Sequence, residues 1–199
     1  MGGPEKYFDK DEKILVKLNL VRGAEAERAV TTHPAVASAF VRILHEAGCR
    51  NMSVGDSCAF GVPVRIMTDL GMAPELEKYG AVMTDCKGSV KTAFPDGIHA
   101  KEFVLAKEVT EADAIASVCK MKTHALEVIT GAVKNQNGVI QGFNTAKGHT
   151  VYTNQESFAR MLVDLNRCVK PRFYVMDGIT AMEGNGPTSG DPVKMNALM

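Results

Sequence analysis

Two lysines, a threonine and a histidine fall within five residues at Lys120-Met121-Lys122-Thr123-His124. In extended backbone alternate side chains share a face, so Lys120, Lys122 and His124 would point the same way. Ammonium groups, together with free backbone N–H groups at a nearby helix start, attract phosphate or carboxylate. We expect Lys120, Lys122 and Thr123 to bind a small anion, and His124 to act as the catalytic acid or base. A solvated basic turn is the alternative interpretation.

A second basic segment, Gly131-Ala132-Val133-Lys134-Asn135-Gln136-Asn137-Gly138, places a lysine and an asparagine between two glycines. Glycine permits close backbone approach to a ligand, and Lys134 and Asn135 supply hydrogen-bond donors. The order of residues is not that of a Walker A motif. We expect Lys134 and Asn135 to bind the ligand, and a helix C-terminus capped by Asn and Gly is the alternative.

The elements that must position these residues alternate between strand and helix. A strand is predicted over 13–20 and a helix over 34–47, which begins after His33 and ends before Gly48. A strand over 51–55 completes a β-α-β unit, which implies parallel strands and a right-handed crossover. The further predicted elements are a helix over 62–79 weakened or broken at Gly71 and Pro74, strands over 81–84, 114–119 and 172–177, helices over 125–134 and 154–167, and a Gly/Pro-rich loop over 184–192.

This alternation predicts one α/β domain over 1–199, with a mainly parallel sheet and helices on both of its faces. Residues 88–94 and 101–107 surround the turn signal Pro95-Asp96-Gly97 and predict a small hairpin-like insertion near 88–107.

Polar residues follow several of the predicted strands at their carboxyl ends, where ligands bind in open parallel sheets. Lys17 and Asn19 end the first strand, Asp56 and Ser57 follow the second, and Asp177 ends the strand at 172–177. We expect Asp177 to be a second catalytic residue, as the partner of the candidate acid–base histidine. The residues expected to border one cavity are Lys17, Asn19, Asp56, Lys120, Lys122, His124, Lys134, Asn135 and Asp177.

The remaining histidines and cysteines give weaker signals. Thr32 or His33 is expected to cap the helix over 34–47 and His45 to lie on the surface, whereas His149, near a Gly/Lys-rich loop, is a further acid–base candidate. Cys58 is expected to be a packed thiol. No pair of cysteines has the spacing of an iron–sulfur or zinc motif, so no metal ligand is assigned, and a mononuclear site at histidine or aspartate side chains is left open.

Composition excludes several classes of protein. The 199 residues contain 23 basic and 23 acidic side chains, and such a balance lacks the positive field of a general nucleic-acid binder. No apolar run has the length of a membrane span, and the N-terminus lacks the apolar stretch of a signal peptide. The odd count of five cysteines argues against a disulfide framework. The sequence therefore predicts a cytoplasmic protein that binds neither nucleic acid nor membrane.

Six motifs occur in the same order as in a known family. They are Lys17-Leu18-Asn19-Leu20, Thr31-Thr32-His33-Pro34, Gly55-Asp56-Ser57, Lys120-Met121-Lys122-Thr123-His124, Gly131-Ala132-Val133-Lys134-Asn135 with Gly138, and Met182-Glu183-Gly184-Asn185-Gly186-Pro187. Across nearly its whole length the chain resembles the domain-of-unknown-function family numbered 362. Members of that family are often described as iron–sulfur or ferredoxin-linked proteins.

The resemblance implies a ferredoxin-type domain or protein as a partner. Many relatives carry a module with CxxCxxC cysteines, which this chain lacks, so cluster binding is not carried over to it. Relatives also continue past the point matched by Asp191-Pro192-Val193, which implies a chain that is incomplete at the C-terminus. A missing part of the sheet would expose an edge strand and favour a homo-oligomer.

Two functions are compatible with these residues, and the cofactor is left unknown. The first is an enzyme domain that binds a small phosphate or carboxylate. The second is a redox-accessory or cofactor-binding module of a ferredoxin-linked iron–sulfur protein. A structural fragment without activity is a third interpretation, which the ordered polar motifs disfavour.

Overall fold

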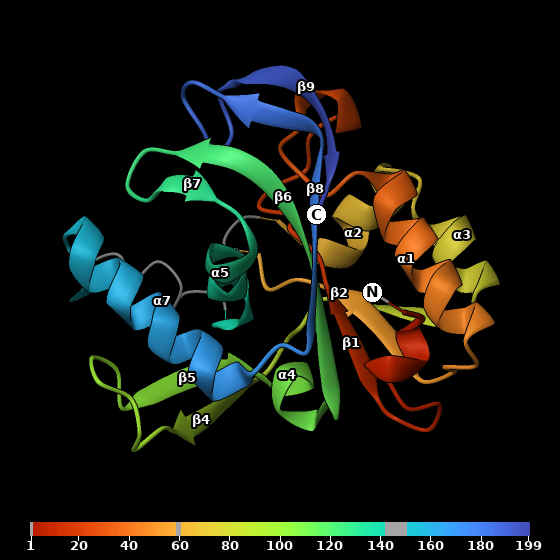
Figure 1. Cartoon of the computed structure of the whole chain (residues 1–199), viewed down its shortest axis with the longest axis horizontal. Helices are drawn as coiled ribbons and strands as arrows, with labels where there is room; N and C mark the ends of the chain where they lie inside the picture. The colour runs from red at the N-terminus through yellow and green to blue at the C-terminus, as the bar shows by residue number, and fades with distance from the viewer. Residues whose placement is uncertain (1, 59–60, 142–150) are drawn as a thin grey trace.

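The computed structural model describes residues 2–58, 61–141 and 151–199 and shows a mixed α/β fold (Figure 1). A seven-stranded sheet is flanked by a separate antiparallel pair of strands. The strands are β1 (Ile14–Lys17), β2 (Met52–Gly55), β3 (Ala81–Thr84), β4 (Ser89–Ala93), β5 (Glu102–Ala106), β6 (Ala114–His124), β7 (Val128–Thr130), β8 (Phe173–Glu183) and β9 (Asp191–Leu198). The order in the large sheet is β3-β2-β1-β6-β8-β9, and β7 pairs with the end of β6.

The centre of the sheet is parallel. β1 lies between β2 and β6, with Ile14 opposite both Met52 and Ala114, and β3 and β8 extend the parallel pairing outward. Only β7 and β9 run antiparallel to their neighbours in the described part of the sheet. The predicted mainly parallel α/β fold is confirmed, and the strands β1, β2, β3, β6 and β8 all point toward the same edge.

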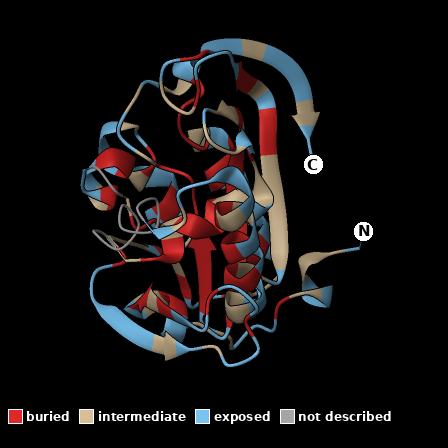
Figure 2. Ribbon diagram, turned by 90° about the vertical axis from the view of Figure 1, so that its left-hand side faces the viewer, coloured by how far each residue is buried: buried red, intermediate tan, exposed pale blue. Residues whose placement is uncertain are grey.

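Helices cover both faces of this sheet, as predicted (Figure 1). They are α1 (Pro34–Glu46), α2 (Pro63–Asp69), α3 (Ala73–Lys78), α4 (Lys107–Glu111), α5 (Ala132–Asn135) and α7 (Gln155–Val169). Because side chains alternate along a strand, Ile14 and Val16 pack in the core under α1 to α3, whereas Leu15 packs in a second core with α7. Figure 2 shows these buried strands between outer segments that are largely exposed.

Local signals set the bounds of α1. The His33 ring accepts a hydrogen bond from the Ala35 N–H at 3.2 Å, Pro34 fills the first turn, and Gly48 has a positive φ just beyond the end of the helix. The predicted helix over 62–79 is broken into α2 and α3 near Gly71, which also has a positive φ.

The predicted insertion near 88–107 is confirmed as the antiparallel pair β4–β5, in which Ser89 lies opposite Ala106. The buried carboxylate of Asp164 on α7 holds its turn. One oxygen of that carboxylate accepts hydrogen bonds from the backbone N–H groups of Ile98, His99 and Ala100 at 2.6–3.0 Å. A single side chain therefore links the insertion to the helix that covers the sheet.

The helix predicted over 125–134 is wrong. Residues Val128–Thr130 form β7 instead, which pairs antiparallel with Lys122–His124, and only Ala132–Asn135 is helical. The run of β-branched side chains in β7 suits a strand, and the longer β6 offers it an edge for pairing. The basic segment after residue 119 is thus strand rather than loop.

The C-terminal part also differs from the prediction. β8 continues past Asp177 to Glu183, and the predicted loop over 184–192 leads into an additional strand, β9. Most side chains of β9 are exposed, so this strand lacks the alternation of apolar and polar residues that predicts a half-buried strand.

Candidate functional site

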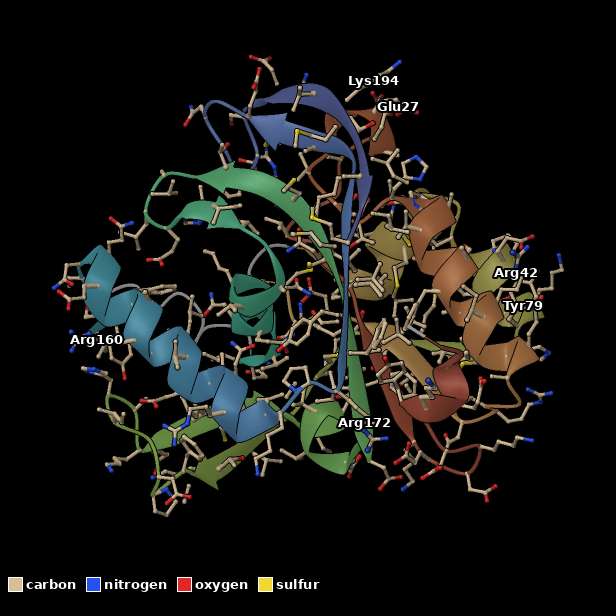
Figure 3. All side chains as sticks on the ribbon, in the orientation of Figure 1. Glu27, Arg42, Tyr79, Arg160, Arg172 and Lys194 are labelled. Carbon is tan, nitrogen blue, oxygen red and sulfur yellow. The ribbon has the colours of Figure 1, made fainter. Side chains whose placement is uncertain are left out.

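A cavity of about 180 Å³ lies at the edge of the sheet where β1 and β2 end. The described residues that line it are Lys17, Asn19, Val21, Asp56, Ser57, Cys58, Lys122, His124, Thr130, Lys134, Asn135, Asn137, Gly138 and Pro187. Arg172 marks the opposite end of the sheet, where β8 begins (Figure 3). Eight of the predicted site residues line this cavity, contributed by segments that lie far apart in the sequence.

A buried ion pair forms one wall of the cavity. The Lys17 Nζ lies 2.8 Å from the Asp56 Oδ1 and also donates a hydrogen bond to the Leu18 carbonyl at 2.6 Å. Asp56 accepts further hydrogen bonds from the backbone N–H groups of Leu20 and Ser57, each at 2.8 Å. The carboxylate thus fixes both the lysine and the loops that follow β1 and β2.

Asn135 joins this wall to α5. Its Oδ1 accepts hydrogen bonds from the Lys17 Nζ and from the Asn19 amide, both at 3.2 Å, while its own amide donates to the Ser117 hydroxyl at 2.9 Å. Gly138 brings the following turn close to the ion pair: a Cβ built there would lie 2.5 Å from the Asp56 Oδ1. Gly138 therefore permits a close approach, as predicted for a glycine here, but to the side chains of Lys17 and Asp56 rather than to a ligand.

Lys122 reaches the cavity from β6. The side chain is 1% exposed, and its Nζ donates a hydrogen bond to the Val30 carbonyl at 2.7 Å. In the described part of the chain no carboxylate forms an ion pair with it. Burial, and next the charge of Lys134, lower the pKa of the Lys122 ammonium to about 7.

Lys134 faces the same cavity from α5. Its Nζ lies 5.9 Å from the centroid of the Phe158 ring, which offers a weak cation–π contact. Burial lowers the pKa of the Lys134 ammonium to about 8, although the charge of Glu127 opposes this shift. The cavity is therefore lined by three amines, one of which is already paired with a carboxylate.

Lys120 and Asp177, both predicted at the cavity, are not among the described residues that line it. They form their own buried ion pair at 2.8 Å, and the same Asp177 oxygen accepts a hydrogen bond from the His33 N–H at 3.0 Å. The register between β6 and β8 shifts between Lys120 and Lys122, which explains why these lysines serve different partners. Thr123 also turns away, since its hydroxyl donates to the Gly184 carbonyl.

His124 lines the cavity, but Asp177 does not accompany it there. The His124 Nδ1 accepts hydrogen bonds from the N–H groups of Leu126 and Glu127, both at 3.1 Å, which hold the ring against the turn between β6 and β7. The other acid–base candidate, His149, lies outside the described residues.

Three oxygens of cavity-lining residues are buried and have no hydrogen-bond partner among the described residues: the Asn19 Oδ1, the Thr130 Oγ1 and the Asn137 Oδ1. Unpaired buried polar atoms are costly, so these oxygens are places where a ligand or water gains hydrogen bonds. Thr130 and Asn137 were not among the predicted site residues. The β-branched run at 128–130 could have placed Thr130 in a strand beside the site.

Cys58 lines the cavity next to the ion pair. Burial, and then the negative charge of Asp56, raise the pKa of the Cys58 thiol well above its ordinary value. The thiol is therefore protonated at neutral pH, which fits its predicted role as a packed side chain. The described residues contain no group of three or more His, Cys, Asp or Glu side chains that could hold a metal ion.

A mainly parallel sheet with a polar cavity at its carboxyl edge defines this chain as an α/β protein. The chain belongs to the family described as Domain of unknown function (DUF362), whose family model matches residues 14–199. The resemblance stated from its motifs is confirmed.

Two known proteins show how far this likeness extends. A thylakoid-associated protein of Synechocystis is 31% identical over 199 residues, which cover 100% of this chain and 61% of that protein. The lactate racemase apoprotein of Thermoanaerobacterium thermosaccharolyticum has a TM-score of 0.58 at 12% identity, over 93% of this chain and 45% of the racemase. The racemase shares the fold, and this chain spans only part of either protein. Among the described residues no helix has the length and apolar character needed to cross a membrane.

Proposed function

We propose that the cavity binds a small metabolite that carries a phosphate or carboxylate, and that this chain is the anion-binding part of an enzyme. The observation that carries the proposal is the set of three lysines, Lys17, Lys122 and Lys134, around one small cavity with Asp56 as the carboxylate among its described lining residues. Since Asp56 is paired with Lys17, the charge of Lys134 and of the protonated form of Lys122 is available to a ligand. An anion offsets their mutual repulsion.

The unpaired oxygens refine the class of ligand. Asn19 and Asn137 present buried carbonyl oxygens at the cavity, and Thr130 presents a hydroxyl. Carbonyl oxygens accept hydrogen bonds, so they suit a ligand with hydroxyl groups beside its anionic group. A small hydroxy acid or sugar phosphate combines both features. Lactate is such an acid. We choose lactate as a probe because the solved structure with the same fold is a lactate racemase.

The binding test titrates the protein with inorganic phosphate, lactate and pyruvate by calorimetry. We expect at least one of these anions to bind, with an affinity that falls as salt is added. Lys134→Ala should weaken that binding by about 1–3 kcal/mol, because a charge-assisted hydrogen bond is lost. Lys91→Ala is the matched control, since Lys91 is exposed and paired with Glu102 in the β4–β5 insertion. Equal affinities for both variants, or no binding of any probe, would contradict the proposal.

Catalysis within this proposal falls to His124, the predicted acid–base residue that lines the cavity. Its ring nitrogen Nδ1 accepts hydrogen bonds from two backbone N–H groups, which fix the orientation of the imidazole at the cavity. The catalytic assignment of Asp177 has less support, because its carboxylate is committed to Lys120 and the His33 N–H. His124→Gln should lower the rate at which the bound metabolite is converted, while the affinity for the anion stays within a few-fold of that of the native protein.

The remaining predictions concern partners and location. Self-association is supported by β9, an edge strand with exposed side chains along most of its length.

A cytoplasmic location remains the expectation from the sequence, while the Synechocystis relative is described as thylakoid-associated. The alternative function, a redox-accessory module beside a ferredoxin-type domain, draws on no contact in the described residues and stays a prediction.

A further inference from the structure

The cavity contains two side chains that could act as nucleophiles, the thiol of Cys58 and the amine of Lys122. A thiol attacks as the thiolate, and the burial of Cys58 beside Asp56 keeps its proton in place. An amine attacks in its neutral form, which burial favours. The environment of the cavity thus disfavours the thiol and favours the amine.

The contacts of Lys122 suit a reactive amine. Its Nζ is bonded to one backbone carbonyl, that of Val30, and the described residues supply no carboxylate to hold it in the charged form. The other buried cavity lysine, Lys17, differs in this respect because Asp56 pairs with it at 2.8 Å. Because its pKa is lowered to about 7, the Lys122 amine loses its proton at neutral pH far more readily than an ordinary lysine.

We infer that the Lys122 amine forms a Schiff base with the carbonyl carbon of a small hydroxylated 2-oxo acid bound in the cavity, for which pyruvate is the simplest probe. The inference rests on the proposed function, since Lys134 must hold the carboxylate of that acid. A 2-oxo acid places its carboxylate one bond from its carbonyl carbon, so neighbouring amines can contact both groups. The cavity volume of about 180 Å³ suits acids the size of pyruvate.

The bonding changes are those of imine formation. The Nζ lone pair attacks the carbonyl carbon, and the π electrons of the C=O bond move to oxygen, which takes up a proton. The resulting carbinolamine loses that oxygen as water while nitrogen gives up its protons and forms the C=N bond. His124, at the same cavity, is placed to supply and remove protons at the departing oxygen. No oxidant or reductant is consumed.

The pH dependence follows from the charged groups around the amine. The charged groups that act on Lys122 are Lys17 on β1, Asp56 after β2, Lys120 on β6 and Lys134 on α5. The cavity also contains the titratable side chains of His124 and Cys58. As pH rises through about 7, Lys122 becomes neutral and reactive. As pH rises through about 8, Lys134 loses the charge that holds the carboxylate. Imine formation should therefore be maximal between these values.

The experiment incubates the protein with pyruvate and sodium borohydride, which reduces an imine to a stable secondary amine, and locates the product by peptide mass mapping. We expect Lys122 to be the main modified residue, with at least ten times the labelling of any other lysine. Inorganic phosphate should protect it, and acetone, which has a carbonyl but no carboxylate, should label it far less. Lys122→Met should abolish the labelling and Lys91→Ala should not.

Mapping on the native chain decides the question even if Lys122→Met fails to fold. Labelling spread over exposed lysines, or centred on Lys134, overturns the inference. Absence of a Lys122 adduct while phosphate, lactate or pyruvate binds in calorimetry also overturns it and leaves the proposed function standing. Absence of both adduct and binding overturns the inference and the proposed function together.

Discussion

The ammonium of Lys17 at the end of β1 lies 2.8 Å from the carboxylate of Asp56 at the end of β2, and both side chains are almost fully buried. Asp56 also accepts hydrogen bonds from two backbone N–H groups, so this pair joins two neighbouring strand ends. The geometry of the cavity wall depends on it.

Asp56→Asn should lower the free energy of unfolding by about 3–5 kcal/mol, because it leaves the Lys17 ammonium buried without its counter-charge. Urea denaturation measures the change. Arg65→Ala is the control: it breaks the exposed Arg65–Asp69 pair on α2 and should cost less than about 0.5 kcal/mol. Equal losses in the two variants would show that the Lys17–Asp56 pair does not stabilise the fold.

Gly138→Ala should displace the ion pair from the cavity wall. The added methyl group would lie 2.5 Å from the Asp56 Oδ1 and 2.8 Å from the Lys17 Nζ, so at least one of these groups has to move. We expect phosphate or carboxylate probes to bind at least ten times more weakly in calorimetry. Gly23→Ala, whose methyl group would make ordinary contact with Ile66 at 3.6 Å, should leave the affinity unchanged. A folded Gly138→Ala protein with native affinity would refute this placement.

Lys122 should make stability increase with pH. Its pKa falls from 10.5 to about 7 on folding, so between these values the unfolded chain binds more protons than the folded one. The contribution of Lys122 to the unfolding free energy therefore rises from pH 7 upward. Lys122→Met removes this contribution, and urea titrations at neutral pH and near pH 10 should show a flatter dependence in the variant. Parallel curves for the two proteins would argue against a depressed pKa.

Asp164→Asn should loosen the β4–β5 insertion. Burial raises the pKa of the Asp164 carboxyl, but the hydrogen bonds from three backbone N–H groups outweigh it and hold the pKa below its ordinary value. The stabilisation is thus present above the ordinary pKa of an aspartate and is lost as pH falls through the lowered value. Hydrogen exchange at residues 98–100 should be faster in the variant, and Asp69→Asn, at an exposed position, should leave it unchanged. Native protection in Asp164→Asn would contradict the assignment.

Elements with strong local signals could be predicted from the sequence. The capping signal at Thr32-His33-Pro34 and the glycine at 48 predicted the bounds of α1 within one residue, and the apolar face of α7 identified that helix. β9 could not, because its partner, rather than its own periodicity, makes it a strand. The signal for β7 was the β-branched run at 128–130, which is only three residues long. An exposed edge strand such as β9 buries too little apolar surface to leave a pattern.

The part of the candidate site that follows from the topology of the sheet could be predicted from the sequence. Parallel strands deliver their ends to one edge, which accounts for the meeting of Lys17, Asp56 and Lys122 at one cavity. The separation of Lys120 from Lys122 was not predictable, since it depends on the register shift between β6 and β8. A bulge changes the neighbours of a strand residue without leaving a pattern in the spacing of lysines.

The length of β6 has a consequence for selectivity. Lys122 and His124 belong to a strand that is paired on both sides, with β8 and with β7, rather than to a loop that could adjust to its ligand. Under the proposed function, a side chain anchored in this way would lose little conformational freedom when a small acid binds. For the proposed function we therefore expect the cavity to select ligands by size, because backbone pairing limits how far Lys122 and His124 can separate.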